Sequence, residues 1–516
     1  MIKGQIKKFF SYLASRMFVF FALIALQVWV IVVLLSEVEA YSEWIQLALQ
    51  IGSIFLVIWI VSKKQNPSYK IAWIILVLAL PVFGMTMYFF FSQRKLNPKE
   101  RRMALGLYEK THKTLMTDEK TKMTLQSMEP CARGQSNYIS KASIYPPYEN
   151  TSTKYYPMGE DFFEDLLVEL KKAEHFIYME YFIIREGRMW NSILHILEQK
   201  AVQGLDVRLM YDDIGCMHTL PAGYKKRMEA KGIKCVVFNP LRPILNSMFN
   251  NRDHRKITVI DGCTGFCGGA NLSDEYINEK KRFGVWKDAS IMLKGEGVWS
   301  LLMMFLHLWA FSEREEIDFD SYTPYKQYDR TELSDGLVQP FSDMPLDDIC
   351  LSEGIIANMI SRAQKYLYIN TPYLILGNEL SMLLENAAMS GVDVRITVPH
   401  IPDKKLVFLI TKAHYAPLIK AGVKIYEYTP GFIHSKTILC DDTTGMVSTV
   451  NLDFRSLYLH FECGVWLHNA SCLAHMKQDY LDTVEVSREI GFADTQNVRW
   501  YQRFMQAILR IIGPMM

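Results

Sequence analysis

The sequence predicts an α/β protein in which N-terminal transmembrane helices are followed by two tandem α/β domains packed as a pseudo-two-fold pair. Three observations lead to this fold class. Long uncharged runs fill roughly the first ninety residues, a strand–helix–strand pattern occurs twice after about residue 150, and one polar motif recurs within that pattern. The 516 residues leave room for about three domains of ordinary size.

The overall composition excludes several classes of protein. Half of the residues are hydrophobic and 22% are charged, which excludes a long disordered or fibrous chain. The 57 Lys and Arg nearly balance the 55 Asp and Glu, whereas a generic nucleic-acid binder carries a strong basic excess. The nine cysteines include no C-x-x-C pair and indicate neither a disulfide framework nor a zinc site.

The first predicted element is a membrane region over residues 1–92. Its three hydrophobic runs, at about 17–36, 44–61 and 71–91, each have the length needed to cross a bilayer as a helix. We therefore expect a multi-pass protein of the cell membrane. Basic residues flank the third run on both sides, so the number of full spans stays open, and Pro81 makes this run a candidate re-entrant segment. The main body is expected on the cytoplasmic side.

The rest of the chain divides into a linker, two copies of one α/β unit and a terminal helix. The predicted bounds are 93–150 for the linker, 151–330 and 331–495 for the two domains, and 496–516 for the amphipathic helix. The repeat is visible in three pairs of segments: 176–179 with 366–369, 204–208 with 391–395, and 232–234 with 422–424. Helix-like stretches at 192–202 and 380–389 lie between the first two, so we expect a parallel sheet flanked by helices.

Each copy contains the pattern H-x-K-x-x-x-x-D, followed by an Asn seventeen residues after the His. The residues are His254, Lys256, Asp261 and Asn271 in the first copy, and His434, Lys436, Asp441 and Asn451 in the second. A single buried histidine is usually only a hydrogen-bonded core residue. The repetition of the same polar residues at the same offsets favours a functional site.

The spacing indicates how these side chains are arranged. Residues 257–260 and 437–440 read as strands, and positions two apart share a face of a strand, so each His and Lys point together. Each Asp falls at an odd offset in a turn and is expected to orient the structure and not to attack. Two lysines and two asparagines suit the oxygens of a phosphodiester anion, while one imidazole attacks phosphorus and the other transfers protons. No metal or cofactor is expected, because no cluster of carboxylates accompanies the motifs.

These motifs resemble those of the phospholipase D superfamily, and the flanking residues resemble the bacterial cardiolipin synthases. The similar segments are 251–257, 268–271 and 286–288 in the first copy, with 371–373, 430–436, 451–456 and 461–462 in the second. The resemblance implies transfer of a phosphatidyl group between two phosphatidylglycerols, which gives cardiolipin and glycerol. It extends over nearly everything after about residue 44.

The resemblance also implies residue roles. His254 would be the nucleophile that forms a phosphatidyl-histidine and His434 the acid and base, although the opposite assignment stays open. The four Lys and Asn side chains would bind phosphate. Glu462 would orient the imidazole of its own copy, that of His434, and Asp288 would do the same in the first copy, at a different offset.

Two alternative functions stay open beside phosphatidyl transfer. A lipid hydrolase of the same superfamily differs only in the acceptor, and a membrane-tethered nuclease uses the same phosphodiester chemistry, but the balanced charge counts against nucleic acid as a partner. The C-terminal residues 498–512 have apolar and basic sides at helical spacing, so the helix lies either at a lipid surface or on the protein core. Oligomeric state and lipid preference are not predicted.

Overall fold

The structure, a computed structural model, describes residues 43–92, 98–115, 119–240, 250–326, 334–345, 349–496 and 500–513, with five single positions between 25 and 33. The chain divides into two compact units. Unit 1 comprises 1–96, 239–251 and 510–516, and unit 2 comprises 97–238 and 252–509. The predicted run over 17–36 lies almost wholly outside the described residues.

Unit 1 contains three apolar helices, α3 (Glu43–Ser62), α4 (Pro67–Ala79) and α5 (Pro81–Phe91). They share a small core in which Trp73 and Tyr88 stack edge to face, with ring centroids 5.3 Å apart. At Gly84 an added Cβ would lie 2.5 Å from the Leu76 carbonyl oxygen, so only glycine permits this close turn of α5 against α4.

The predicted runs in unit 1 are partly corrected by these helices. The run over 44–61 corresponds to α3, but the run over 71–91 is two helices that meet at Leu80 and Pro81, because proline lacks the N–H that would continue α4. Among the described residues, no helix combines the length and the apolar character that crossing a membrane requires. The predicted spans are therefore not confirmed.

Within the described residues, unit 2 contains one mixed sheet of fifteen strands and a separate two-stranded sheet formed by Val285–Lys287 and Gly431–Ile433. The first repeat supplies β1 (Tyr148–Tyr156), β2 (Phe176–Tyr181), β3 (Asp206–Asp212), β4 (Lys234–Phe238), β5 (Lys256–Ile260), β6 (Thr264–Gly268), β7 (Val285–Lys287) and β8 (Ser290–Gly295). The second supplies β9 (Ser334–Asp343), β10 (Tyr366–Asn370), β11 (Asp393–Pro399), β12 (Lys424–Tyr428), β13 (Gly431–Ile433), β14 (Thr437–Cys440), β15 (Thr444–Ser448), β16 (Glu462–His468) and β17 (Ser487–Glu489).

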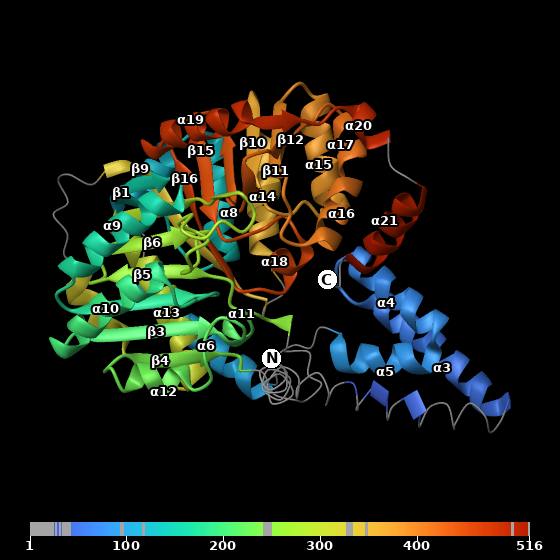
Figure 1. Cartoon of the computed structure of the whole chain (residues 1–516), viewed down its shortest axis with the longest axis horizontal. Helices are drawn as coiled ribbons and strands as arrows, with labels where there is room; N and C mark the ends of the chain where they lie inside the picture. Colours follow the sequence, from blue (N-terminus) through green and yellow to red (C-terminus); the bar gives the residue numbers. More distant parts are fainter. Residues whose placement is uncertain are drawn as a thin grey trace, which may run out of the picture. The chain divides into compact units, whose positions relative to one another are not determined.

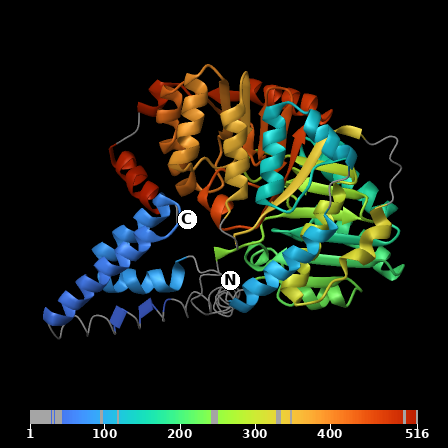
Figure 2. The same ribbon diagram turned by 180° about the vertical axis from the view of Figure 1, so that it is seen from behind.

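The strand order is mirrored about the centre of this sheet. It runs β17-β12-β11-β10-β14-β15-β16-β9 in the second repeat and continues β1-β8-β6-β5-β2-β3-β4 in the first, and the two repeats join through antiparallel β9 and β1. Figure 1 shows the green strands of the first repeat and the orange to red strands of the second as two blocks, and Figure 2 shows yellow β9 at their junction. This mirrored order is the arrangement that a pseudo-two-fold pair requires.

The predicted parallel sheet is correct only for part of each repeat. Strands β2, β3 and β4 are parallel, as are β10, β11 and β12, but β5 and β6 form an antiparallel hairpin, as do β14 and β15. The hairpins follow from tight turns in which Asp261 and Asp441 have positive φ angles of 51° and 54°. A turn of this length cannot connect parallel strands.

Helices cover both faces of the sheet and include those predicted at 192–202 and 380–389, which are α10 and α15. The helices are α6 (Pro98–Thr114), α7 (Glu119–Ser127), α8 (Pro130–Ala142), α9 (Gly159–Lys172), α10 (Arg188–Val202), α11 (Asp213–Cys216), α12 (Tyr224–Glu229), α13 (Val298–Glu313), α14 (Leu351–Arg362), α15 (Asn378–Met389), α16 (Lys405–Ala413), α17 (Tyr415–Lys420), α18 (Phe454–Tyr458), α19 (Cys472–Glu485), α20 (Phe492–Gln496) and α21 (Trp500–Ile512), with a 3₁₀ segment over Phe319–Lys326.

The largest core of unit 2 is shared by the two repeats. Helix α13 is buried on every side from Val298 to Ala310, and it packs in one cluster with Ile291 of β8 and Val465 of β16. The segment predicted as a linker also enters this core, because α6 contributes the buried side chain of Leu107. The two repeats therefore depend on common packing.

Candidate active site

The two motif histidines lie where the repeats exchange backbone hydrogen bonds. The N–H of His254, just before β5, donates to the carbonyl of Phe461 at 2.9 Å. The N–H of His434, between β13 and β14, donates to the carbonyl of Lys287 at 2.7 Å, where β13 and β7 pair in parallel. The main chain therefore holds each histidine next to a residue of the opposite repeat. His254 lies beside Glu462, which follows Phe461, and His434 lies beside Asp288, which follows Lys287.

Glu462 and Asp288 are the two carboxylates that the sequence predicts to orient the histidines. The Nδ1 atom of His254 lies 3.0 and 3.1 Å from the two carboxylate oxygens of Glu462, and Nδ1 of His434 lies 2.6 Å from Oδ2 of Asp288. The prediction that each acid orients the histidine of its own repeat is wrong. The pairing is crossed, since the backbone contacts between β7 and β13, and between Asp253 and Phe461, join opposite repeats.

Both pairs are removed from solvent. Each histidine is 7% exposed and each carboxylate is fully buried. A buried carboxylate that accepts a hydrogen bond from Nδ1–H keeps the proton on that nitrogen and leaves the lone pair on Nε2, the form needed by a nucleophile or a base. Thr449 donates a hydrogen bond to Glu462 and helps to hold that carboxylate in place.

Each motif lysine reaches its own histidine, although the pairs do not share a strand as predicted: His254 precedes β5, and His434 and Lys436 precede β14. The Nζ atoms of Lys256 and Lys436 donate to the carbonyl oxygens of His254 and His434, respectively, and Lys436 Nζ is also 2.8 Å from Nδ1 of His434. Both lysines are 2% exposed. Two buried ammonium groups in one site form a receptor for an anion.

The electrostatics of the site follow from burial and from these cations. Burial, and then Lys256 and Lys436, hold the pKa of His254 well below its usual range. The pKa of His434 is lowered to about 4, first by burial and then by Lys436, against the opposing pull of Asp288. The pKa of Lys436 is lowered to about 7, mainly by burial, while Asp288 raises it and Lys256 lowers it by less. A bound phosphodiester anion would reverse these effects because it favours every positive charge nearby.

The motif aspartates lie at the turns after β5 and β14. The Asp261 carboxylate accepts hydrogen bonds from three consecutive main-chain N–H groups, those of Glu174, His175 and Phe176, at 2.7–2.8 Å. Asp441 accepts the equivalent three from Gln364, Lys365 and Tyr366, at 2.7–2.9 Å. These contacts anchor the starts of β2 and β10 and fit the orienting role expected of the aspartates.

The two motif asparagines are both buried but differ in their contacts. Asn271 accepts a hydrogen bond from the N–H of Ile183 and donates one to the Tyr276 hydroxyl at 2.7 Å, and the Tyr276 ring lies 5.6 Å from that of His434. Among the described residues, Oδ1 of Asn451 has no hydrogen-bond partner. Asn271 is thus already held in place, whereas Oδ1 of Asn451 can still accept a hydrogen bond.

Several residues at the site were missed by sequence reasoning. The rings of Trp286 and Phe432 lie 5.4 and 5.8 Å from the His434 ring, and Phe182 lies 5.0 Å from the His254 ring. His460, 5.5 Å from His254, was missed as well. Trp286 and Phe432 lie on strands, two residues before Asp288 and His434, and this spacing could have identified them. No local sequence pattern distinguishes Phe182 or His460.

Comparison with known proteins identifies the family to which the chain belongs. A family model described as "Cardiolipin synthase, PLD-like domain" matches residues 166–290 and 356–483, which contain all ten predicted site residues, and a "Phospholipase_D-nuclease N-terminal" model matches 51–93. The cardiolipin synthase of Halalkalibacterium halodurans is 32% identical over 465 residues, which cover 90% of this chain and 92% of that relative. The chain belongs to the cardiolipin synthase family.

Other relatives extend the comparison. A cardiolipin synthase 2 of Bacillus cereus is 33% identical over 88% of both chains, and an uncharacterised protein of Streptococcus mutans is 38% identical over 89% of this chain and 99% of its own length. A solved phosphatidylserine synthase of Haemophilus influenzae aligns with a TM-score of 0.53 at 15% identity, over 70% of this chain and 93% of that one. That structural similarity shows the fold alone.

Proposed function

We propose that this member of the cardiolipin synthase family is a phosphatidyltransferase that joins two phosphatidylglycerols into cardiolipin and releases glycerol. The observation that carries the proposal is the pair of buried imidazoles, each aligned by a carboxylate of the opposite repeat and each beside a buried lysine. Two oriented imidazoles and two cations are the groups that metal-independent transfer of a phosphodiester needs.

In the first step, Nε2 of His254 attacks phosphorus of the donor lipid. The P–N bond forms as the P–O bond to the glycerol headgroup breaks, and His434, which is protonated because the bound phosphodiester raises its pKa, gives its proton to the departing oxygen. Glu462 stabilises the imidazolium that forms at His254, while the lysines and the asparagines hold the non-bridging oxygens. The opposite assignment of the two histidines uses the same contacts.

In the second step, His434, now neutral, removes a proton from a primary hydroxyl of a second phosphatidylglycerol. That oxygen attacks phosphorus, the P–N bond breaks, and His254 regains its starting form. Water in place of the lipid hydroxyl would give phosphatidic acid, so only the acceptor separates a transferase from a hydrolase.

Purified enzyme supplied with labelled phosphatidylglycerol in detergent or vesicles tests the proposal. We expect cardiolipin and glycerol in equal amounts, and we expect His254→Ala and His434→Ala each to abolish turnover while the protein stays folded. Mostly phosphatidic acid would identify a hydrolase instead. Near-normal turnover by either variant would refute the two-imidazole mechanism.

We further propose that the enzyme works at the cell membrane, with residues 1–92 as its membrane region and its catalytic body, domains 151–330 and 331–495, on the cytoplasmic side. Helix α21 supports contact with lipid. Its polar face turns toward α16, where Gln506 donates to the Leu409 carbonyl at 3.3 Å, while the apolar side chains of Trp500 and Phe504 are 79% and 61% exposed.

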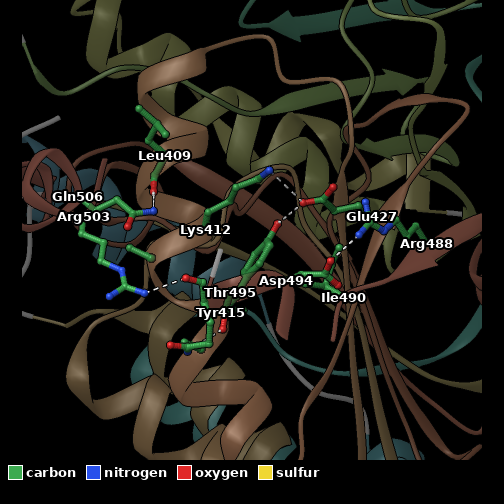
Figure 3. Close-up of a pocket in the computed structure, with 13 residues that line it drawn as sticks. Leu409, Lys412, Tyr415, Glu427, Arg488, Ile490, Asp494, Thr495, Arg503 and Gln506 are labelled. Atoms are coloured by element: carbon green, nitrogen blue, oxygen red, sulfur yellow. Dashed lines mark hydrogen bonds and ion pairs between the residues drawn. The ribbon is translucent and has the colours of Figure 1, made fainter. Parts of the chain in front are cut away.

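A cavity beside α21 is lined by polar side chains of this helix, which indicates the same orientation. It has a volume of about 480 Å³ and lies among residues of α16, α17, α20 and α21, and it contains none of the predicted site residues. Figure 3 shows Arg503 and Gln506 at this cavity, and the Arg503 guanidinium donates to the Gln496 carbonyl at 2.9 Å. A helix that packed on the protein core would present its apolar face there, so the exposed face suits a lipid surface.

A further inference from the structure

His460 is a buried imidazole beside the catalytic histidine that the transfer mechanism does not use. Its side chain is 12% exposed, and its ring centroid lies 5.5 Å from that of His254. Neither ring nitrogen has a hydrogen-bond partner among the described residues. Buried polar nitrogens are nearly always paired in folded proteins, so this imidazole is available for another ligand.

The main chain places His460 where a ligand could bridge it to His254. The residue follows α18, where its N–H donates to the Arg455 carbonyl at 2.9 Å, and it precedes the Phe461 bridge to the first repeat. Its Nδ1 atom lies 3.7 Å from a carboxylate oxygen of Glu462, the same oxygen that lies 3.0 Å from Nδ1 of His254.

His254, His460 and Glu462 therefore offer two imidazole nitrogens and one carboxylate oxygen, all within 4.8 Å of one another. Two imidazoles and a carboxylate are a common donor set for Zn²⁺, whereas Mg²⁺ and Ca²⁺ prefer oxygen ligands only. Bonds of about 2.0–2.1 Å require the donors to close around the ion. By the geometric criteria for a hydrogen bond, neither ring nitrogen of His460 has a partner among the described residues, so no such bond has to be broken for the ring to approach an ion.

We propose that His254, His460 and Glu462 form a zinc-binding site through which Zn²⁺ inhibits this enzyme. The inhibition rests on the proposed function, whereas the binding does not. Zinc bound here engages the His254 imidazole and its aligning carboxylate, so the ring cannot attack phosphorus. The nearby Lys256 and Lys436 oppose any cation in the site, which restricts it to ions with strong affinity for imidazole.

Inhibition of the full-length enzyme provides the first test. We expect Zn²⁺ to suppress cardiolipin formation reversibly, with recovery after EDTA, and equal concentrations of Mg²⁺ to have no such effect. His460→Asn, with inhibition expressed relative to its own activity in metal-free buffer, should require at least about tenfold more Zn²⁺ for half-inhibition, as expected for loss of one ligand. His195→Asn, which changes an exposed histidine of α10, should behave like the parent enzyme.

Equal inhibition of the parent and His460→Asn would overturn the proposal, because zinc bound to lipid headgroups would act on both alike. A second test is independent of activity. Full-length parent protein, with and without His460→Asn, is titrated with Co²⁺ and followed by visible absorption. We expect a ligand-field band that is lost with His460→Asn. Identical spectra of the two proteins would refute the site whether or not the parent makes cardiolipin, and a His460-dependent band in a parent that makes no cardiolipin would refute only the proposed function.

Discussion

Two buried carboxylates are in contact with one nitrogen of each motif imidazole, and we expect them to determine which nitrogen faces the substrate. Glu462 and Asp288 each contact Nδ1 of a histidine in the opposite repeat and leave Nε2 for chemistry. An amide at either position can donate to Nδ1 as well as accept from it, so it no longer selects one tautomer. The carboxylates therefore act on the reaction through the rings that they hold.

We predict that Asp288→Asn and Glu462→Gln each lower kcat by about 10²- to 10⁴-fold, as loss of the aligning carboxylate does in comparable histidine sites. Steady-state kinetics with phosphatidylglycerol would measure the effect. Glu186→Gln changes an exposed carboxylate paired with Arg227 and serves as the control, with unchanged kcat. An Asp288→Asn enzyme with parental kcat would contradict the crossed pairing as a functional feature.

Lys436 gives the site a pH dependence. Its pKa is lowered to about 7, mainly by burial, so in the substrate-free enzyme the side chain is charged below about pH 7 and neutral above it. Only the charged form attracts a phosphodiester anion. We therefore predict that kcat/KM falls as the pH rises through about 7, while kcat changes less because bound substrate favours the ammonium form.

A pH profile of kcat/KM for the parent and for Lys436→Arg checks this prediction. The guanidinium stays charged over this range, so the variant should lose the decline near pH 7 even though its altered shape lowers the absolute rate. A parent profile that stays flat between about pH 6 and about pH 9 would show that Lys436 does not titrate there.

At the scale of elements, the hairpin turns after β5 and β14 act as anchors for neighbouring strands. Asp261 holds three main-chain N–H groups at the start of β2, and Asp441 does the same for β10. We predict that Asp261→Ala lowers the free energy of unfolding by about 1–3 kcal/mol, because it leaves main-chain donors without their acceptor.

Thermal denaturation in detergent would measure this loss, together with kcat of the folded enzyme. Because the carboxylate binds only main chain, kcat at low temperature should fall far less than in the His254→Ala enzyme. Asp320→Ala, in the exposed 3₁₀ segment, provides a control of the same chemistry. A large loss of kcat without a change in stability would assign Asp261 to the chemistry.

The exposed apolar face of α21 leads to a second prediction at the scale of elements. If its apolar face enters a lipid surface, Phe504→Glu should weaken that contact by about tenfold or more, since it forfeits burial of an aromatic side chain. Hydrogen exchange of α21 amides in vesicles that contain phosphatidylglycerol, compared with detergent, would report the contact. Val202→Glu alters another exposed apolar residue, 86% exposed at the end of α10, and should leave α21 unaffected.

Local patterns predicted the elements well. The strands at 176–179 and 366–369 and the helices at 192–202 and 380–389 all follow from short-range periodicity. The crossed acids could not be predicted in this way. Offsets along the chain compare Glu462 with the histidine of its own repeat, whereas the partner is chosen by strand pairing between residues more than two hundred positions apart.

At the scale of the whole of unit 2, the repeats share one sheet and one core. Leu467 of β16 is fully buried in a cluster that also contains Phe176 of β2. We predict that Leu467→Ala costs about 2–5 kcal/mol and lowers the stability of both repeats together, because a cavity in a shared core weakens every element around it.

Hydrogen exchange resolved by peptide would distinguish joint from separate unfolding. Amides of β2 and of β10 should lose protection at the same temperature in the parent and shift together in Leu467→Ala. Loss of protection confined to β10 and its neighbours would show that the second repeat unfolds alone. The shared core could not be read from the sequence, because an evenly apolar helix such as α13 does not indicate which strands surround it.

The exchange of acids between repeats also bears on how the enzyme is made. A ribosome that has finished the first motif has produced an imidazole whose aligning acid is still about two hundred codons away. A polypeptide that ends before residue 462 therefore lacks the acid that aligns the first imidazole, and so does a proteolytic fragment that contains the first copy alone. We expect full activity only after residue 462 has been synthesised and folded into place.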